Sequence, residues 1–488
     1  MRILIDTNIF IPLEDSSSVL DESFSELVRL SNENNHQVLA HPSSIDDIER
    51  DDDEKRKEIS LSRIRKYSFL KDPPILSDQE ADSLGLKNDN DNDRVDNEIL
   101  FAIYKDAANI LVTEDRDVHK KAKILGIEGR VHYIQQAVQS LKRLHQRVHV
   151  SLPNIKEKYL HQLDLNISFF DSLREDYSDF NEWYKRSSRN GRKGWIHENE
   201  SGELGAILIY KEEINEIITD DNKALPSTSL KLCTFKVGED IRGRKIGELF
   251  FKAAFRYATA NKIEHIYITM RSGKHEFLED LCVDFGFYRY GDYKGDYVYV
   301  KDHPNDPPIV SAGSLSALEY HKRFYPHFKY DESIKVFIIP IKPIFHEMLF
   351  PDNQDQRNLF AYSAVGNAIK QAYLCHANTR QIAEGDIIFF YRSQDKKSIT
   401  SIGVVESVGE FKDPDKIIQL VSKRTVYSYE DIKTMAEKKT KVILFRVASH
   451  LSEPIKYNWL LEQRIVNGPI QTIRRISDDS FKKIISKQ

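Results

Sequence analysis

Short apolar runs alternate with helix-forming segments over residues 1–140. Residues 3–5 and 110–112 are such runs, and residues 96–107 and 118–126 have the spacing of amphipathic helices. Strands that are apolar on both faces are typical of parallel sheets, whose strands are joined by helices. The pattern therefore predicts an N-terminal α/β domain that is built on a parallel sheet.

The chain is too long for a single hydrophobic core. Its 488 residues predict two to four domains. Residues 302–314 are rich in proline and lack apolar periodicity, which is typical of a linker. Short β-forming runs after residue 331 indicate a small β-barrel with helical insertions. We expect a multidomain protein of mixed α/β and α+β class, with domains over residues 1–140, 155–301 and 331–488 and a linker over 302–330.

The composition excludes several classes of protein. Forty per cent of the residues are apolar and 30% are charged, and no apolar run approaches the ~20 residues of a membrane span. No signal peptide is visible. Cys233, Cys282 and Cys375 lie too far apart in the sequence for a disulfide framework or a CxxC zinc pair. These features favour a soluble cytoplasmic protein without a membrane partner.

Charge is unevenly distributed along the chain. Residues 1–150 contain 21 basic and 29 acidic residues, a balance of −8, and residues 151–330 contain 26 and 28, a balance of −2. Residues 331–488 contain 24 and 19, a balance of +5. The acidic end is suited to cations and the basic end to a polyanion, although ordinary solvated faces explain both balances.

Four aspartates of the first segment stand at or near the ends of predicted strands. Asp6 and Asp115 follow apolar runs, Asp47 lies near the start of a helix, and Asp96 shares the apolar face of its helix. Because the carboxyl ends of parallel strands meet at one edge of a sheet, we expect these carboxylates to converge. Hard divalent cations relieve the repulsion between carboxylates. The sequence therefore predicts a Mg²⁺ or Mn²⁺ site.

The first 140 residues resemble the PIN-domain ribonucleases. The resemblance is carried by "LIDTNIF", by Asp47 after "LAHPSSI", by Asp96 before "ILFAI" and by "LVTEDRDVHKKAKILGI". It implies metal-dependent hydrolysis of single-stranded RNA. The implied catalytic metal ligands are Asp6, Asp47, Asp96 and Asp115, with Asp117 as an outer candidate, and with Asp46 and Glu49 as alternatives for the second acid.

The stretch "RGRKIGELFFKAAFRYA", residues 242–258, joins a predicted strand to an amphipathic helix. The amides at a helix N-terminus bind anions, and Arg242, Arg244 and Lys245 add positive charge. The stretch therefore predicts a site for a pyrophosphate.

This stretch resembles the acetyl-CoA loop of GNAT acetyltransferases, Q/R-x-x-G-x-G/A, with Lys245 in place of the middle glycine. Residues 275–302 resemble the closing helix, the "GF" turn and the last strand of that family. Cys282 stands where many members have a tyrosine that protonates the departing thiolate, and Glu239, Asp240 or a nearby tyrosine are alternatives. The resemblance implies an acetyl-CoA site made of Phe235, Val237, Arg242, Gly243, Arg244, Lys245, Ile246 and Gly247.

The third segment combines aromatic and basic residues. Phe389, Phe390, Tyr391 and Arg392 follow one another, and aromatic rings with cations suit single-stranded RNA. Consecutive strand residues point to opposite faces, so at least one of these rings packs in a core. The segment resembles PUA-like domains of the ASCH or EVE type, which implies RNA binding. The ASCH motif G-x-K-x-x-E-x-R is not evident, so the resemblance does not extend to catalysis.

Three functions follow from these resemblances. The first is a metal-dependent endoribonuclease with an acetyl-CoA-binding GNAT domain and a PUA-like domain that positions single-stranded or structured RNA such as tRNA. The second is an N-acetyltransferase acting on RNA or on a translation-linked protein, with the PIN-like domain in recognition. The third is a non-enzymatic RNA-binding scaffold, and a homo-oligomer is compatible with each. The order PIN, GNAT and PUA-like resembles a bacterial multidomain family.

Overall fold

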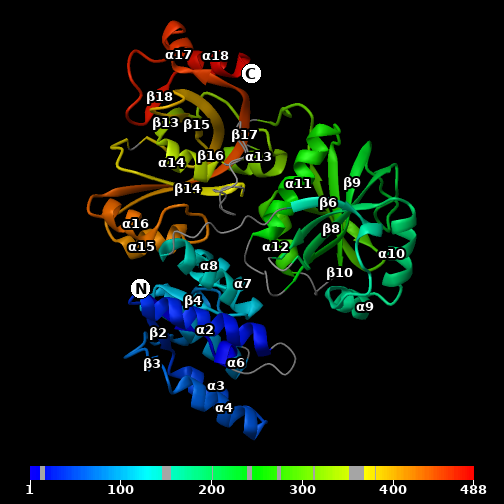
Figure 1. Ribbon diagram of the computed structural model, residues 1–488, viewed down its shortest axis with the longest axis vertical. Helices are drawn as coiled ribbons and strands as arrows, with labels where there is room; N and C mark the ends of the chain where they lie inside the picture. The colour runs from blue at the N-terminus through cyan, green and yellow to red at the C-terminus, as the bar shows by residue number, and fades with distance from the viewer. Residues whose placement is uncertain are drawn as a thin grey trace. The chain divides into compact units, whose positions relative to one another are not determined.

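The computed structural model describes residues 1–10, 17–88, 90–145, 155–199, 202–238, 245–271, 276–311, 314–350, 368–379 and 381–487 (Figure 1). These residues form two compact units. The first unit contains the described residues up to 145 together with residues 410–440, and the second contains the others. No helix within the described ranges combines the length and the apolar character that crossing a membrane requires.

The first unit is built on a five-stranded sheet in the order β3-β2-β1-β4-β5, and every strand pair is parallel. The predicted parallel α/β sheet is thus confirmed. Leu4 packs with Leu111 in one core, whereas Ile3 and Ile5 pack in another, because successive strand residues point to opposite faces. The elements are β1 (Arg2–Ile5), α1 (Thr7–Phe10), α2 (Ser17–Glu33), β2 (Gln37–Ala40), α3 (Ser43–Glu49), α4 (Glu54–Ile64), β3 (Ser68–Phe69), α5 (Asp78–Ser83), α6 (Asp91–Tyr104), β4 (Ile110–Val112), α7 (Arg116–Ile124), η1 (Glu128–Arg130), β5 (Val131–His132) and α8 (Ile134–His145).

Two helices from the third segment complete the first unit: α15 (Pro414–Val421) and α16 (Tyr429–Ala436). Lys423 Nζ donates to the carbonyls of Glu128 and Val131, each at 2.7 Å. Arg143 donates to the carbonyl of Ser422 at 3.1 Å. The sequence predicted that residues 331–488 form one domain, whereas residues 410–440 belong to the first unit. The prediction missed this because the contacts join residues about 280 positions apart in the sequence.

The second unit contains a seven-stranded mixed sheet in the order β11-β12-β10-β9-β8-β7-β6. Its neighbours are antiparallel except for β9 and β10, which are parallel and are connected through α11. Phe250 and Phe251 of α11 pack on one face, and Phe180 and Tyr184 of α10 pack on the other. The elements are β6 (Ile155–Tyr159), η2 (Leu160–Gln162), η3 (Ser168–Phe170), α9 (Asp171–Asp176), α10 (Phe180–Arg189), β7 (Lys193–Glu198), β8 (Leu204–Ile214), β9 (Thr228–Val237), α11 (Ile246–Ala260), β10 (His265–Arg271), α12 (Glu276–Asp284), β11 (Tyr288–Tyr293) and β12 (Asp296–Asp302).

The second unit also contains a six-stranded sheet in the order β14-β17-β16-β15-β13-β18. The predicted strands of the third segment are present, while closure into a barrel stays a prediction. Phe389 and Phe390 of β15 are fully buried and Tyr391 is 4% exposed, so the interpretation of these rings as an RNA-stacking surface is wrong. The elements are α13 (Ala317–Phe324), β13 (Val336–Ile341), α14 (Pro343–Leu349), β14 (Lys370–Cys375), β15 (Ile387–Arg392), β16 (Ser398–Phe411), β17 (Thr440–Lys456), α17 (Tyr457–Glu462), β18 (Arg474–Ile476) and α18 (Asp478–Ser486).

The predicted linker of residues 302–330 contains structure. Residues 317–324 form α13, which begins with a capping box at Ser316. Lys301 is fully buried, and its ammonium group donates to the carbonyls of Lys322 and Arg323 at 2.9 and 2.8 Å. The proline-rich stretch is therefore followed by a helix whose C-terminal carbonyls hold the buried amino group of Lys301, whose pKa burial lowers to about 7, rather than by a free linker.

The turn between α12 and β11 approaches α13 closely at Gly286. Its φ is +83°, and a Cβ atom at this position would lie 2.0 Å from the carbonyl oxygen of Lys322. Gly295 has nearly the same φ, +85°, but a Cβ atom there would meet no atom within 4 Å. The two glycines thus share a backbone conformation that strains other residues, and they differ in the space available to a Cβ atom.

We expect Gly286→Ala to destabilise the protein far more than Gly295→Ala. The left-handed backbone costs an alanine about 1 kcal/mol at either position. The contact with Lys322 adds at least about 2 kcal/mol for Gly286→Ala. Urea denaturation followed by circular dichroism measures the difference, and equal losses for the two variants would contradict this account.

Candidate functional site

The four predicted aspartates of the first unit are close enough to interact electrostatically. Asp6 follows β1 and Asp115 follows β4, the neighbouring parallel strand, while Asp47 lies on α3 and Asp96 on α6. Asp6 interacts electrostatically with Asp115 and Asp47, and Asp96 interacts with Asp6, Asp115 and Asp47. The parallel sheet therefore places these carboxylates, distant in the sequence, within electrostatic range of one another, while their convergence on one site stays a prediction.

Hydrogen bonds fix two of these carboxylates. Asp6 is 2% exposed and accepts from the amide of Thr7 at 2.7 Å, from Asn8 Nδ2 at 2.6 Å and from Thr113 Oγ1 at 2.5 Å. Asp115 caps α7 by accepting from the amides of Asp117 and Val118. Burial raises the pKa of Asp6 to about 6, although the hydrogen bonds from Thr113 and Thr7 lower it.

Asp96 differs from the other three. Within the described residues, its carboxylate makes no hydrogen bond or ion pair, whereas Asp47 accepts from Arg50 at 2.9 Å. Burial and the charges of Asp6 and Asp115 raise the pKa of Asp96 to about 8. An unpaired carboxylate beside other carboxylates is suited to bind either a proton or a cation.

The four aspartates have the chemistry of a metal site but not its geometry. The donors are carboxylate oxygens, which Mg²⁺ and Mn²⁺ prefer. As the side chains lie, however, no three His, Cys, Asp or Glu residues in the described ranges are placed to hold a metal ion. Asp117 is exposed and paired with Lys120 at 2.8 Å, and the alternatives Asp46 and Glu49 are exposed. The cation site therefore stays a prediction.

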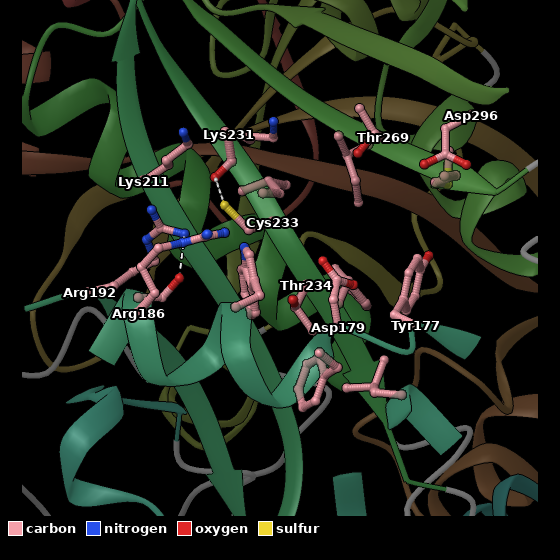
Figure 2. A pocket seen from close by; sticks show the side chains of 18 of the residues that line it. Tyr177, Asp179, Arg186, Arg192, Lys211, Lys231, Cys233, Thr234, Thr269 and Asp296 are labelled. Carbon is pink, nitrogen blue, oxygen red and sulfur yellow. Dashed lines mark hydrogen bonds between the residues drawn. The ribbon is translucent and has the colours of Figure 1, made fainter. Parts of the chain in front are cut away.

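A cavity of about 430 Å³ lies in the second unit, against the face of the seven-stranded sheet that α10 covers (Figure 2). β9 and β10 pair only from Ser229 with His265 to Leu232 with Ile268, and beyond these residues the strands part. Cys233 is an extra residue in β9, because Leu232 pairs with Tyr210 of β8 and Thr234 with Ile209. The cavity lies along this bulge and the parting strands, and is lined by Leu173, Tyr177, Asp179, Phe180, Trp183, Arg186, Ser187, Asn190, Arg192, Lys211, Lys231, Leu232, Cys233, Thr234, Phe235, Ile268, Thr269, Met270, Leu278 and Asp296.

The predicted acetyl-CoA residues lie partly within the described structure. Arg242, Gly243 and Arg244 lie outside it, as do the alternatives Glu239 and Asp240. Phe235 lines the cavity, and both Phe235 and Val237 pack against the core of the sheet. Ile246 and Gly247 begin α11.

Lys245, which replaces the middle glycine of the acetyl-CoA loop, has a left-handed backbone with φ of +60°. This is the conformation that favours glycine, so a lysine stands here where the backbone suits a residue without a side chain. The ammonium group of Lys245 donates to the carbonyl of Lys370 at 3.3 Å and lies 3.9 Å from Glu248. The side chain is therefore held by these partners of β14 and α11.

Cys282, the candidate proton donor, is fully buried in the core between α11, α12 and the sheet. It does not line the cavity, and burial raises the pKa of its thiol well above its ordinary value. A proton-donating role for Cys282 therefore has no support. Tyr177 does line the cavity, and burial together with Asp296 raises the pKa of its hydroxyl, which keeps its proton at neutral pH.

The cavity has charged ends that the sequence analysis did not anticipate. Figure 2 shows Arg186, Arg192, Lys211 and Lys231 grouped around Cys233, and Tyr177, Thr269 and Asp296 on the opposite side. These residues come from the end of α9, from α10, from the residue before β7, and from β8, β9, β10 and β12. No short motif contains them, so only the sheet register and the packing of α10 could reveal the site.

The raised pKa values of the first unit predict a pH-dependent stability. Asp6 and Asp96 bind a proton more tightly in the folded than in the unfolded protein, so the stability that they contribute is fully present below about pH 4. It is lost as the pH rises through about 6 for Asp6 and about 8 for Asp96. In metal-free buffer, we expect Asp96→Asn to raise the melting temperature by several degrees at pH 8.5 and to leave it unchanged at pH 4. Asp82→Asn, at an exposed position, is the control, and an unchanged melting temperature for Asp96→Asn at pH 8.5 would refute the prediction.

No family model and no curated protein matches the chain. Among solved structures, the chain is similar to an ASCH protein of Zymomonas mobilis, with 16% identity, coverage of 31% of this chain and 94% of that one, and a TM-score of 0.25. It is also similar to an acetyltransferase of the GNAT family from Listeria monocytogenes, with 17% identity, coverage of 32% and 98%, and a TM-score of 0.24. The PaiA N-acetyltransferase of Thermoplasma acidophilum in complex with coenzyme A has 14% identity, coverage of 31% and 99%, and a TM-score of 0.22.

Proposed function

We propose that residues 155–302 transfer an acetyl group from acetyl-CoA to an amine. The observation that carries the proposal is the cavity that runs along the parting of β9 and β10. The resemblance of residues 242–258 to the acetyl-CoA loop, and the glycine-like backbone of Lys245, support binding of the cofactor at the start of α11. The described residues present there are Phe235, Val237, Lys245, Ile246 and Gly247.

Acetyl-CoA supplies an acetyl group that is activated as a thioester. The protein has to hold an amine near the strand parting and keep water away. The bound amine would first lose a proton to Asp296 or to solvent; its nitrogen would then form the amide bond as the thioester C–S bond breaks, and the departing CoA thiolate would take a proton from the Tyr177 hydroxyl or from solvent. The last pair of residues between β9 and β10 includes Ile268, and Asp296 of β12 pairs with Arg271, three residues further along β10. The carboxylate of Asp296 therefore lies beside the place where β9 and β10 separate, and it attracts a protonated amine. The protonated hydroxyl of Tyr177, which interacts with Asp296, can donate a hydrogen bond in the same region. Apolar side chains such as Phe235 and Met270 line the adjoining wall.

The first test is binding of acetyl-CoA, measured by isothermal titration calorimetry. A Cβ atom at Gly247 would lie 2.7 Å from Leu281 Cδ2 and 3.4 Å from the ring of Phe235, so we expect Gly247→Trp to abolish binding. Gly468→Trp is the control, because a Cβ atom at Gly468 meets no atom within 4 Å. Circular dichroism checks that both variants fold. Absence of binding by the wild-type protein, or equal binding by Gly247→Trp, would refute the proposal.

We also propose a second activity, cleavage of RNA by the first unit. The specific observation in its favour is the unpaired carboxylate of Asp96, which interacts electrostatically with Asp6, Asp47 and Asp115. No three of these carboxylates are placed to hold a metal ion as the described side chains lie, so their side chains would have to turn toward one another to bind Mg²⁺ or Mn²⁺. The ion would then supply an activated water and neutralise charge on a phosphate. The basic balance of residues 331–488 favours RNA as the partner. RNA binding by residues 331–488 and formation of a homo-oligomer stay predictions.

This second proposal is tested without relying on activity alone. At pH 8, we expect Mn²⁺ to raise the melting temperature of the wild-type protein, because the ion binds the folded state, and to have little effect on Asp96→Asn. Asp82→Asn should respond as the wild type does. Cleavage of a single-stranded RNA in Mn²⁺ should be lost in Asp6→Asn and Asp96→Asn. An identical response of Asp96→Asn and the wild type to Mn²⁺ would remove the basis for the activity.

A further inference from the structure

We propose that the acceptor of the central domain is a small amine that carries an anionic group, phosphate or carboxylate, on the order of 10 Å from its nitrogen. This inference rests on the proposed acetyl transfer and names its substrate class. It is carried by the separation of charge inside the cavity, with cations at one end and a carboxylate at the other (Figure 2).

The cationic end of the cavity consists of Arg186, Arg192, Lys211 and Lys231, and the acidic groups near it do not neutralise its positive charge. Lys211 forms an ion pair with Glu213, and Lys231 lies 3.9 Å from the same carboxylate, which also accepts a hydrogen bond from Tyr267. Arg192 donates to the neutral hydroxyl of Ser187 at 3.0 Å. A single carboxylate is thus bonded to two of the cations within the described residues.

Arg186 increases this imbalance. It lies exposed on α10 at the rim of the cavity, and its side chain makes no hydrogen bond or ion pair with any described residue. Cys233, which faces Arg192, Lys231 and Lys211, adds no negative charge, because burial raises the pKa of its thiol despite those cations. The four cations and Glu213 together carry a formal charge of +3, which an anionic ligand would neutralise.

The other end of the cavity contains Asp296, near the strand parting where the acetyl group is to be transferred, and Asp179 lines the wall beside Thr234 (Figure 2). A protonated amine is attracted there, so the two charged ends orient an acceptor with its nitrogen toward the thioester. The orientation follows from charge alone and does not require contacts to the middle of the ligand.

The strand register gives the separation. Leu232 of β9 pairs with Ile268 of β10. The cationic end lies one residue before Leu232, where Lys231 pairs with Lys211 of β8. The acidic end lies three residues after Ile268, where Arg271 pairs with Asp296 of β12. The two ends are therefore four residues apart along the strands, about 13 Å, and two strands apart across the sheet, about 10 Å, which gives about 16 Å between backbones. Long cationic side chains shorten the distance to the ligand. A cavity of about 430 Å³ has the size of a small-molecule site and not of a macromolecular one.

The test compares 6-aminohexyl phosphate with 6-amino-1-hexanol, which lacks the phosphate. We expect calorimetry without acetyl-CoA to detect binding of the phosphate compound and at least tenfold weaker binding of the alcohol. With acetyl-CoA, the phosphate compound should be acetylated with the higher kcat/KM. 6-Aminohexanoic acid, which carries a carboxylate in place of the phosphate, identifies which anion the site prefers.

Two variants of α10 localise the effect. Arg186→Gln should weaken binding of 6-aminohexyl phosphate about tenfold, whereas Arg189→Gln should leave it unchanged, because Arg189 is exposed on the same helix and does not line the cavity. Equal affinity for the phosphate compound and the alcohol, or equal effects of the two variants, would overturn the inference.

The outcomes also separate the inference from the function on which it rests. If acetyl-CoA binds and both amines react equally, the charge selection is wrong while the acetyl transfer stands. If 6-aminohexyl phosphate binds as expected and no acetyl-CoA binds, the ligand class stands and the acetyl transfer is wrong. Acetylation of a protein or an RNA without acetylation of any anionic small amine would overturn the substrate class.

Discussion

The parallel pairing of β9 and β10 is the constraint on which the candidate acetyltransferase site depends. Two parallel strands cannot be joined by a short turn, so the chain has to cross over through α11. The pairing ends after Leu232 and Ile268, and the extra residue Cys233 displaces β9 from the regular ladder. The same local departure therefore places the N-terminus of a helix, a gap in the sheet and a cavity in one region.

Charged side chains in the described part of the second unit fall into two groups, those with charged partners and those without. Arg446 is 2% exposed and is paired with Asp284 at 2.6 Å and with Glu406 at 3.3 Å. Although burial raises the pKa of Asp284, the charges of Arg446 and Lys370 hold it far below its ordinary value, so this cluster is a stable ionic bridge between α12, β14, β16 and β17. Arg186 and Asp296 have no such partners among the described residues. Charges that are fully paired hold the fold, whereas charges that stay unpaired around a cavity are available to a ligand.

The sequence predicted the features that depend on local pattern. The parallel sheet, the proximity of Asp6, Asp96 and Asp115 and the helix at residues 246–260 follow from apolar runs and helical spacing alone. The RNA-stacking interpretation of Phe389 and Phe390 failed because both faces of β15 are buried, as is typical of an unbroken apolar run such as residues 387–391.

The remaining features depend on contacts between distant residues. The grouping of residues 410–440 with the first unit depends on contacts such as that of Lys423 with Glu128, and α13 lies in a stretch whose prolines suggested a linker. The charged cavity was missed because Arg186, Lys211 and Asp296 become neighbours only through strand register and helix packing.

The placement of α15 and α16 has a consequence for biosynthesis. The first unit begins at β1 but is completed by residues 410–440, which lie between β16 and β17 of the other unit. A ribosome must therefore translate as far as residue 440 before the first unit has all its described parts, and a nascent chain that stops short of residue 410 leaves the carbonyls of Glu128 and Val131 without their bonds to Lys423. Completion of the first unit thus follows the synthesis of the second-unit strands that precede α15 and α16 in the chain.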